Sequence, residues 1–211
     1  MGWLALGLFV LYAGIGFGWR SWVQWRRTGD HGLRGFSGRA LTAEWWAGLS
    51  FGLATLLVAL GPVDAIAGWT PIVTLERPWV AALGTALTLA GIAGTVWTQL
   101  AMGASWRVGV DDSERTALVT SGPFGVARNP IFTMMVLTVG GLFLMVPTLT
   151  SLLGLVLFVV AVQLQVRVVE EPYLRRTHGQ GYADYLASVG RFVPGVGVDR
   201  LGSGEHAGSV R

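Results

Sequence analysis

Long uncharged apolar segments alternate with short polar connections along this chain. The apolar segments lie at residues 2–19, 43–60, 79–100, 131–145 and 148–166. A helix needs about 20 predominantly apolar residues to cross a bilayer, and the last two segments are a little shorter than that. The pattern predicts an all-α integral membrane protein with about five transmembrane helices. For residues 131–166, a re-entrant hairpin that enters the membrane without fully crossing it is the alternative.

Turn-forming residues set the expected ends of these helices. Gly61 and Pro62 are expected to stop the second helix. A short apolar piece at 66–73 is expected to lie in the membrane interface, and Pro78 to open the third helix. Further along the chain, Pro147 marks a tight turn between the last two segments.

The polarity pattern divides the chain into three parts. Residues 1–102 carry the first three predicted helices. Residues 103–200 carry polar loops, the helical hairpin and a cytoplasmic tail helix. Gly179 and Gly181 make a single continuous helix in this tail less favourable. Residues 201–211 are rich in Gly and Ser and are expected to be disordered.

Composition supports the membrane class and limits the partners. Hydrophobic residues make up 52% of the chain and charged residues 13%, whereas soluble domains carry about 25% charged residues. We therefore expect the lipid bilayer as a partner. There is no Cys and no H-x-x-H spacing, so no metal site is expected. The net charge is only +3 and basic residues do not alternate with aromatic ones, so nucleic acid is not an expected partner; the oligomeric state stays open.

The arginines indicate an orientation. All 15 basic residues are arginine; 14 fall in the connections 20–42 and 103–130 or after residue 166, and one, Arg77, falls in the connection 61–78. Cytoplasmic loops of membrane proteins carry the excess of basic residues. The N-terminus is therefore expected outside and the C-terminus in the cytoplasm, in a membrane that we expect to be a bacterial plasma membrane.

One polar stretch, residues 118–132, runs directly into an apolar segment. Its Gly122 permits backbone conformations that let amides point at a ligand. Asn129 is placed as the N-cap, and Pro130 as the first-turn residue, of the following helix. A helix N-terminus presents N–H groups and a positive potential, so the carboxylate of a small cofactor is a suitable guest. The other interpretation is an ordinary turn and cap where the chain enters the membrane.

A second polar cluster, Glu170 and Glu171, lies where the apolar hairpin returns to the same side. Two carboxylates at the end of an apolar span are costly unless they are solvated or paired. Neighbours on a helix point about 100° apart, so one could bind ribose hydroxyls or an amine while the other meets solvent or an arginine. We expect the two polar clusters to face each other and hold a cofactor at the membrane surface. The alternative is an interfacial anchor.

Other catalytic patterns are missing from the sequence. Ser121 has no neighbouring histidine base or G-x-S-x-G elbow, and there is no Walker loop or strand-linked G-x-G-x-x-G. His178 is expected to be a solvated histidine. Tyr182 and Tyr185 are expected to pack the tail against the loops.

Four motifs, taken in order, resemble one family. They are L-V-T-S-G-P-F-x-x-x-R-N-P-I-F at 118–132, E-E-x-x-L at 170–174, G-x-x-Y-x-x-Y at 179–185 and R-F-V-P at 191–194. Together they make the region from 103 to 194 resemble the isoprenylcysteine carboxyl methyltransferase family, which belongs with the phospholipid methyltransferases of integral membrane type. The first three helices match only in character.

The resemblance implies a helical membrane enzyme that uses S-adenosyl-L-methionine without a Rossmann domain. The cofactor would enter from the cytoplasm, and a lipophilic acceptor, such as a prenylated cysteine carboxylate, from the bilayer. The cofactor-binding residues that it implies are Asp111, Thr116, Ala117, Leu118, Val119, Phe124, Asn129, Pro130, Ile131, Phe132 and Glu170. The catalytic residues that it implies are Arg128, Asn129, Arg167 and Glu171.

The chain departs from the family pattern at several of these positions. Asn129 stands where the family usually has histidine, and an amide cannot titrate near neutral pH. Phe124 and Phe132 stand where tyrosines are common. A family arginine associated with the substrate would fall at Val166, with Arg167 one position away.

Two other functions stay open at this point. One is an NADPH-dependent membrane reductase of related architecture, and the other is a non-catalytic relative in which Asn129 marks lost activity. The acceptor atom is open as well. A carboxylate acceptor needs no general base, whereas an amine would need one, for which Glu171 and His178 are the nearby candidates.

Overall fold

The computed structural model describes residues 1–32, 40–106 and 117–199. Within these ranges the protein is helical, and its extended pairings are two isolated bridges. The longer elements are α1 (Gly2–Ala13), η1 (Gly14–Trp19), α2 (Arg20–Thr28), α3 (Ala43–Ala67), α4 (Pro78–Met102), α5 (Pro130–Met145), α6 (Leu149–Leu164), η5 (Gln165–Glu170), α7 (Glu171–His178) and α8 (Gln180–Ser188). The short 3-10 turns are η2 (Val73–Leu75), η3 (Gly103–Ser105) and η4 (Gly122–Gly125).

Four helical stretches are long and apolar enough to cross a membrane: residues 2–28, 43–67, 78–102 and 149–178. The fifth apolar helix, α5, has 16 residues and is about 24 Å long, against about 30 Å of hydrocarbon. Many large hydrophobic side chains on these helices are exposed, as on a surface that faces lipid. The predicted all-α membrane architecture is confirmed. The last span is longer than predicted, because α6, η5 and α7 form one continuous helix.

The predicted end of the second helix at Gly61 and Pro62 is wrong. α3 continues to Ala67, and Gly68 ends it in the left-handed conformation at φ 69°. Proline removes one backbone hydrogen bond, but a membrane helix tolerates this where neighbouring elements cover the site. Here Pro62 is buried, and Gly61 packs so closely on α6 that an added Cβ would lie 2.8 Å from the Ser151 Cβ.

The connection after α3 is tied to the turn between α5 and α6. The Ile72 N–H donates to the Pro147 carbonyl at 2.8 Å, and the Leu149 N–H donates to the Thr70 carbonyl at 3.0 Å. Asp64, buried near the end of α3, accepts hydrogen bonds from the N–H and the hydroxyl of Thr70. These bonds fasten two helical hairpins to each other at one end of the bundle.

Glycines let the backbones of neighbouring helices come close together. α4 packs along α5, and α3 packs along α6. A Cβ added at Gly91 would lie 2.6 Å from the Thr138 nitrogen, and one added at Gly141 would lie 2.5 Å from the Thr88 nitrogen. Gly154 of α6 approaches the backbone of α3 in the same way. Small residues at such contacts are typical of membrane helix pairs.

We expect Gly141→Ala to destabilise the bundle, because the added methyl group would meet the nitrogen and the hydroxyl of Thr88 at 2.5 Å. Overpacking of this kind costs about 1–3 kcal/mol. Gly140→Ala is the matched control, since a Cβ there meets nothing within 4 Å. Thermal unfolding in detergent should show a lower Tm for Gly141→Ala alone. Equal Tm values would contradict a close α4–α5 contact.

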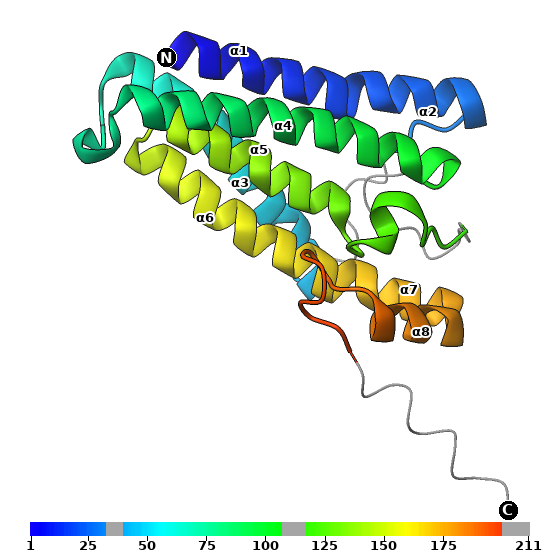
Figure 1. Cartoon of the computed structure of the whole chain (residues 1–211). Helices are drawn as coiled ribbons and strands as arrows, with labels where there is room; N and C mark the ends of the chain where they lie inside the picture. The colour runs from blue at the N-terminus through cyan, green and yellow to red at the C-terminus, as the bar shows by residue number, and fades with distance from the viewer. Residues whose placement is uncertain (33–39, 107–116, 200–211) are drawn as a thin grey trace, which may run out of the picture.

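The bundle has two chemically different ends (Figure 1). The N-terminus, the α3–α4 connection and the α5–α6 turn share one end, where a Cβ added at Gly2 would touch Ile66. The other end carries α2, the end of α4, the start of α5, α7 and α8. We term it the arginine-rich end, because the connections with most of the arginines lead to it. The positive-inside rule predicts that this end faces the cytoplasm.

Candidate functional site

The stretch that leads into α5 is a tight turn at the arginine-rich end. It contains η4, whose Gly122 has φ 60°, a backbone conformation that favours glycine. Pro123 and Phe124 of this turn are buried. α5 then starts at Pro130, which is the first-turn placement that the sequence predicts.

Asn129 occupies the predicted N-cap position, but its side chain does not cap α5. The side-chain Nδ2 donates to the Arg191 carbonyl at 3.1 Å, and the same carbonyl accepts the Asn129 backbone N–H at 3.0 Å. The amide thus holds the C-terminal tail. The first N–H groups of α5 are left without a side-chain cap.

The tail that follows α8 lies against this stretch in a parallel bridge. The Arg128 N–H donates to the Gly190 carbonyl at 2.8 Å. The Thr133 hydroxyl, one turn into α5, donates to the Phe192 carbonyl at 2.8 Å. The R-F-V-P motif therefore builds the same site as the R-N-P motif, although the two lie far apart in the sequence.

One buried carboxylate joins the stretch, the tail and α7. Glu171 accepts hydrogen bonds from Arg128 Nη2 at 3.2 Å and from Arg191 Nε and Nη2 at 2.7 Å and 3.0 Å. The Arg128 side chain is 1% exposed and also donates to three carbonyls between residues 186 and 197. The bonds to Glu171 raise the pKa of Arg191 above its usual value. We term Arg128, Glu171 and Arg191 the ion cluster.

The structure joins the two predicted polar clusters through Glu171. Glu170 is the last residue of η5 and is half-buried. Successive residues of a helix point about 100° apart, so Glu170 is turned to a different side from Glu171. The sequence left two roles open for this pair: one carboxylate binds a ligand, and the other meets solvent or an arginine. Glu171 has the second role, because it pairs with arginines.

Two tyrosines dock α8 on the stretch, as the sequence predicts. The rings of Tyr182 and Tyr185 meet edge to face with centroids 6.1 Å apart, and both are buried. The Tyr185 hydroxyl donates to the Phe124 carbonyl, which ties α8 to η4. Burial raises the pKa of Tyr185 to about 12, so this hydroxyl keeps its proton at neutral pH.

The other predicted cofactor-binding residues lie along the same stretch with different exposures. Ala117 is exposed, and Leu118 and Val119 are half-buried. At the start of α5, Ile131 and Phe132 are half-buried and pack against the apolar core of the bundle. The stretch therefore has one polar side toward the ion cluster and one apolar side toward the membrane helices.

Two of the predicted residues cannot be placed, and a third, Arg167, is not joined to this site. Asp111 and Thr116 lie outside the described residues. Arg167 is exposed, and its Nε donates to Gln163 Oε1, one turn earlier, at 3.0 Å. Val166, where the family arginine was expected, is fully buried.

Sequence reasoning missed two residues that the structure places here, Arg191 and Thr133. Arg191 is the one charged residue between positions 185 and 198, which is a signal that the sequence does contain. A lone charge in an otherwise uncharged segment needs a partner when the segment docks. Thr133 follows Asn129 by four positions, one helical turn, and so points to the same side of α5.

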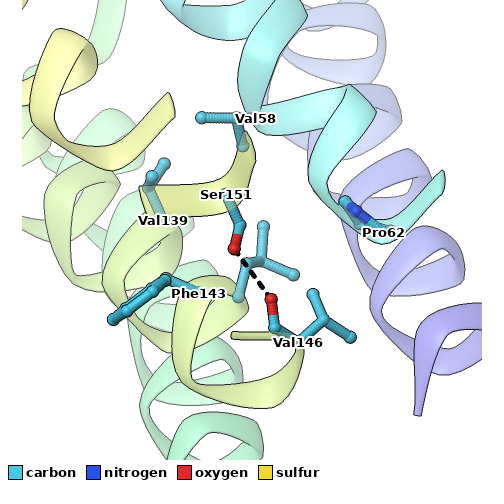
Figure 2. Close-up of a pocket in the computed structure, with 7 residues that line it drawn as sticks. Val58, Pro62, Val139, Phe143, Val146 and Ser151 are labelled. Atoms are coloured by element: carbon cyan, nitrogen blue, oxygen red, sulfur yellow. Dashed lines mark hydrogen bonds between the residues drawn. The ribbon is translucent and has the colours of Figure 1, made fainter. Parts of the chain in front are cut away.

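A small apolar cavity lies toward the opposite end of the bundle (Figure 2). Its walls come from α3, α5 and α6 and include Val58, Pro62 and Phe143, and its volume is about 10 Å³. The Ser151 hydroxyl donates to the Val146 carbonyl at 2.8 Å beside it. A space of this size holds one water molecule at most, so this cavity is not a candidate ligand site.

Apolar helices that end in a buried ion cluster define a helical integral membrane protein with its candidate site at one end of the bundle. Residues 79–181, from α4 to the start of α8, match the phospholipid methyltransferase family. This region therefore resembles a family of membrane methyltransferases, which confirms the kinship predicted from the motifs. No individual curated protein matches the chain in sequence.

Proposed function

We propose that this protein is an S-adenosyl-L-methionine-dependent methyltransferase that acts on a lipophilic acceptor at the cytoplasmic face of the membrane. The observation that carries the proposal is the contact between Arg128 and Glu171, 43 positions apart and 3.2 Å from each other. It brings the separate family motifs together at one end of an apolar bundle. Such an arrangement suits a soluble cofactor and an acceptor that is dissolved in the bilayer.

The residues around the start of α5 fit this cofactor. S-adenosyl-L-methionine has a carboxylate, and α5 starts without a side-chain cap, so its first N–H groups suit that anion. Glu170 suits the ribose hydroxyls or the amino group. Leu118 and Val119, both half-buried, offer apolar surface for the adenine ring. When bound, the cofactor supplies a methyl group on a positively charged sulfur.

We assign the ion cluster a positioning role. It holds the tail against the start of α5, and Asn129 does the same through the Arg191 carbonyl. The Glu171 carboxylate is committed to two guanidinium groups, so it is poorly suited to act as a general base. This favours an acceptor that is already a nucleophile, such as a carboxylate. Arg167, exposed on η5, is proposed to meet the acceptor and not the cofactor.

Calorimetry with S-adenosyl-L-methionine and protein purified in detergent tests this proposal. We expect Glu170→Gln to weaken binding about tenfold, which corresponds to about 1.4 kcal/mol. Glu76→Gln, an exposed carboxylate at the opposite end, is the control and should bind like the wild type.

Two outcomes would contradict the proposal in different ways. A wild-type protein that binds no S-adenosyl-L-methionine at millimolar concentration is not such an enzyme, and binding of NADPH instead would favour the reductase alternative. Wild-type affinity in Glu170→Gln would move the cofactor away from this carboxylate. Mass spectrometry of lipid extracts from cells fed labelled methionine, with and without the protein, would identify the acceptor.

A further inference from the structure

The first membrane helix contains a buried cation outside the region that matches the family. Arg20 is the first residue of α2 and is 1% exposed, although its helix is one of the candidate membrane spans. The family match begins at residue 79 and so gives no role to Arg20. Arginines near the ends of membrane helices usually extend toward water, so a buried one requires an explanation.

The contacts of Arg20 among the described residues are with neutral groups. Its Nη1 donates to Gln24 Oε1 at 3.2 Å, and its Nη2 donates to the Gly103 carbonyl at 2.6 Å. The guanidinium lies over the Trp106 ring, 4.6 Å from its centroid. The Nε is buried without a hydrogen-bond partner. Since a guanidinium has five N–H donors, these two hydrogen bonds do not saturate it.

Within the described part of the chain, the neighbouring charge on α2 is positive as well. α2 contains Arg26 and Arg27 and no acidic residue, and Arg27 is close enough to repel Arg20. The next residue, Ser21, is also buried with a hydroxyl that has no partner. A buried cation is costly unless an anion pairs with it. The inner surface of α2 therefore has the donors and the charge of an anion site.

We propose that Arg20 binds an anionic oxygen group, either a phosphate or a carboxylate, at the arginine-rich end of the bundle. A guanidinium binds such groups edge-on through parallel N–H bonds while its face stays stacked on an aromatic ring. The stacking on Trp106 and the unused Nε are compatible with this geometry. The anion comes from a phospholipid headgroup or from an acidic acceptor; the second source rests on the proposed function.

Lipid retention tests the site independently of methyl transfer. The full chain is placed in phosphatidylcholine nanodiscs that contain phosphatidylglycerol, and the lipids that stay bound after extraction are identified by native mass spectrometry. For a headgroup site, the wild type retains phosphatidylglycerol and Arg20→Gln retains about tenfold less, the effect of one lost charge-assisted hydrogen bond. Arg77→Gln, an exposed arginine at the opposite end, is the charge-matched control and should retain as much as the wild type.

Methylation kinetics with a prenylated cysteine distinguish the second source. If retention is equal in all three proteins, an acceptor site requires that Arg20→Gln raise KM about tenfold with kcat nearly unchanged, the signature of lost uniform binding. Failure of the wild type to bind S-adenosyl-L-methionine would contradict the proposed function. The lipid measurement alone would then test whether Arg20 binds an anion.

The anion site is overturned if folded Arg20→Gln has both the lipid retention and the KM of the wild type. It is also overturned if lipid retention is unchanged and the wild type itself has no methyltransferase activity. If Arg20→Gln does not fold, two binding measurements on the wild type test the anion site. A wild type that shows no preference for phosphatidylglycerol over phosphatidylcholine, and that binds a prenylated cysteine no more tightly than its neutral amide, has no anion site at Arg20.

Discussion

Glu171→Ala should release the C-terminal tail from the start of α5. The substitution leaves Arg128, whose side chain is 1% exposed, and Arg191 without their carboxylate. Removing one partner of a buried ion pair costs about 3–5 kcal/mol, because the other charge stays buried. Chemical unfolding in detergent should show this loss as a lower midpoint. Trypsin should then cut after Arg191, which is held in hydrogen bonds in the intact protein.

Two other substitutions show whether the charge is responsible. Glu76→Ala removes an exposed carboxylate at the opposite end and should change the stability by less than about 0.5 kcal/mol. Glu171→Gln keeps an acceptor oxygen and should fall between the two. A loss below about 1 kcal/mol for Glu171→Ala, the range of exposed ion pairs, would mean that water reaches the cluster and that other contacts hold the tail.

Gly190→Ala should displace the same tail for a steric reason. A Cβ at this position would lie 2.1 Å from the Val193 carbonyl oxygen and 2.8 Å from the Gly195 nitrogen. Both are backbone atoms, so no side-chain rotation can make room. The turn has to open, and the bonds from the N–H groups of Arg128 and Asn129 to the tail are lost with it. We expect the affinity for S-adenosyl-L-methionine to fall about tenfold or more in the calorimetric measurement.

Gly181→Ala is the matched control for this substitution. Gly181 lies in α8, where a Cβ meets nothing within 4 Å. Because alanine favours a helix over glycine by about 1 kcal/mol, this variant should be as stable as the wild type or slightly more so. If Gly190→Ala binds the cofactor like Gly181→Ala, the tail is not part of the cofactor site.

The membrane helices could be predicted because a bilayer leaves the backbone few options besides a helix. Each of the five apolar segments is helical in the structure. Helix ends were less predictable. The signal at Gly61 and Pro62 is local, whereas α6 packs against this point and lets α3 continue. The sequence of one segment does not show which other helix will pack against it.

The site shows the same division between local and distant information. Motif order predicted that the Arg-Asn-Pro stretch meets the glutamate pair, but it did not tell Glu170 from Glu171. One reason is η5, a π-helical turn that widens the helix just before Glu171, so that counting along a regular helix misplaces the side chains. The bond from Asn129 to the Arg191 carbonyl joins residues 62 positions apart, and nothing in the sequence near either residue indicates it.

The tail that Arg191 and Phe192 bring to the start of α5 has a consequence for biosynthesis. Chains are made from the N-terminus, so α1 to α6 are synthesised before this part of the site exists. A nascent chain that stops short of Gly190 contains all the described membrane helices but lacks the carbonyls that accept the backbone N–H groups of Arg128 and Asn129. The site therefore cannot be complete before the last membrane helix has been synthesised.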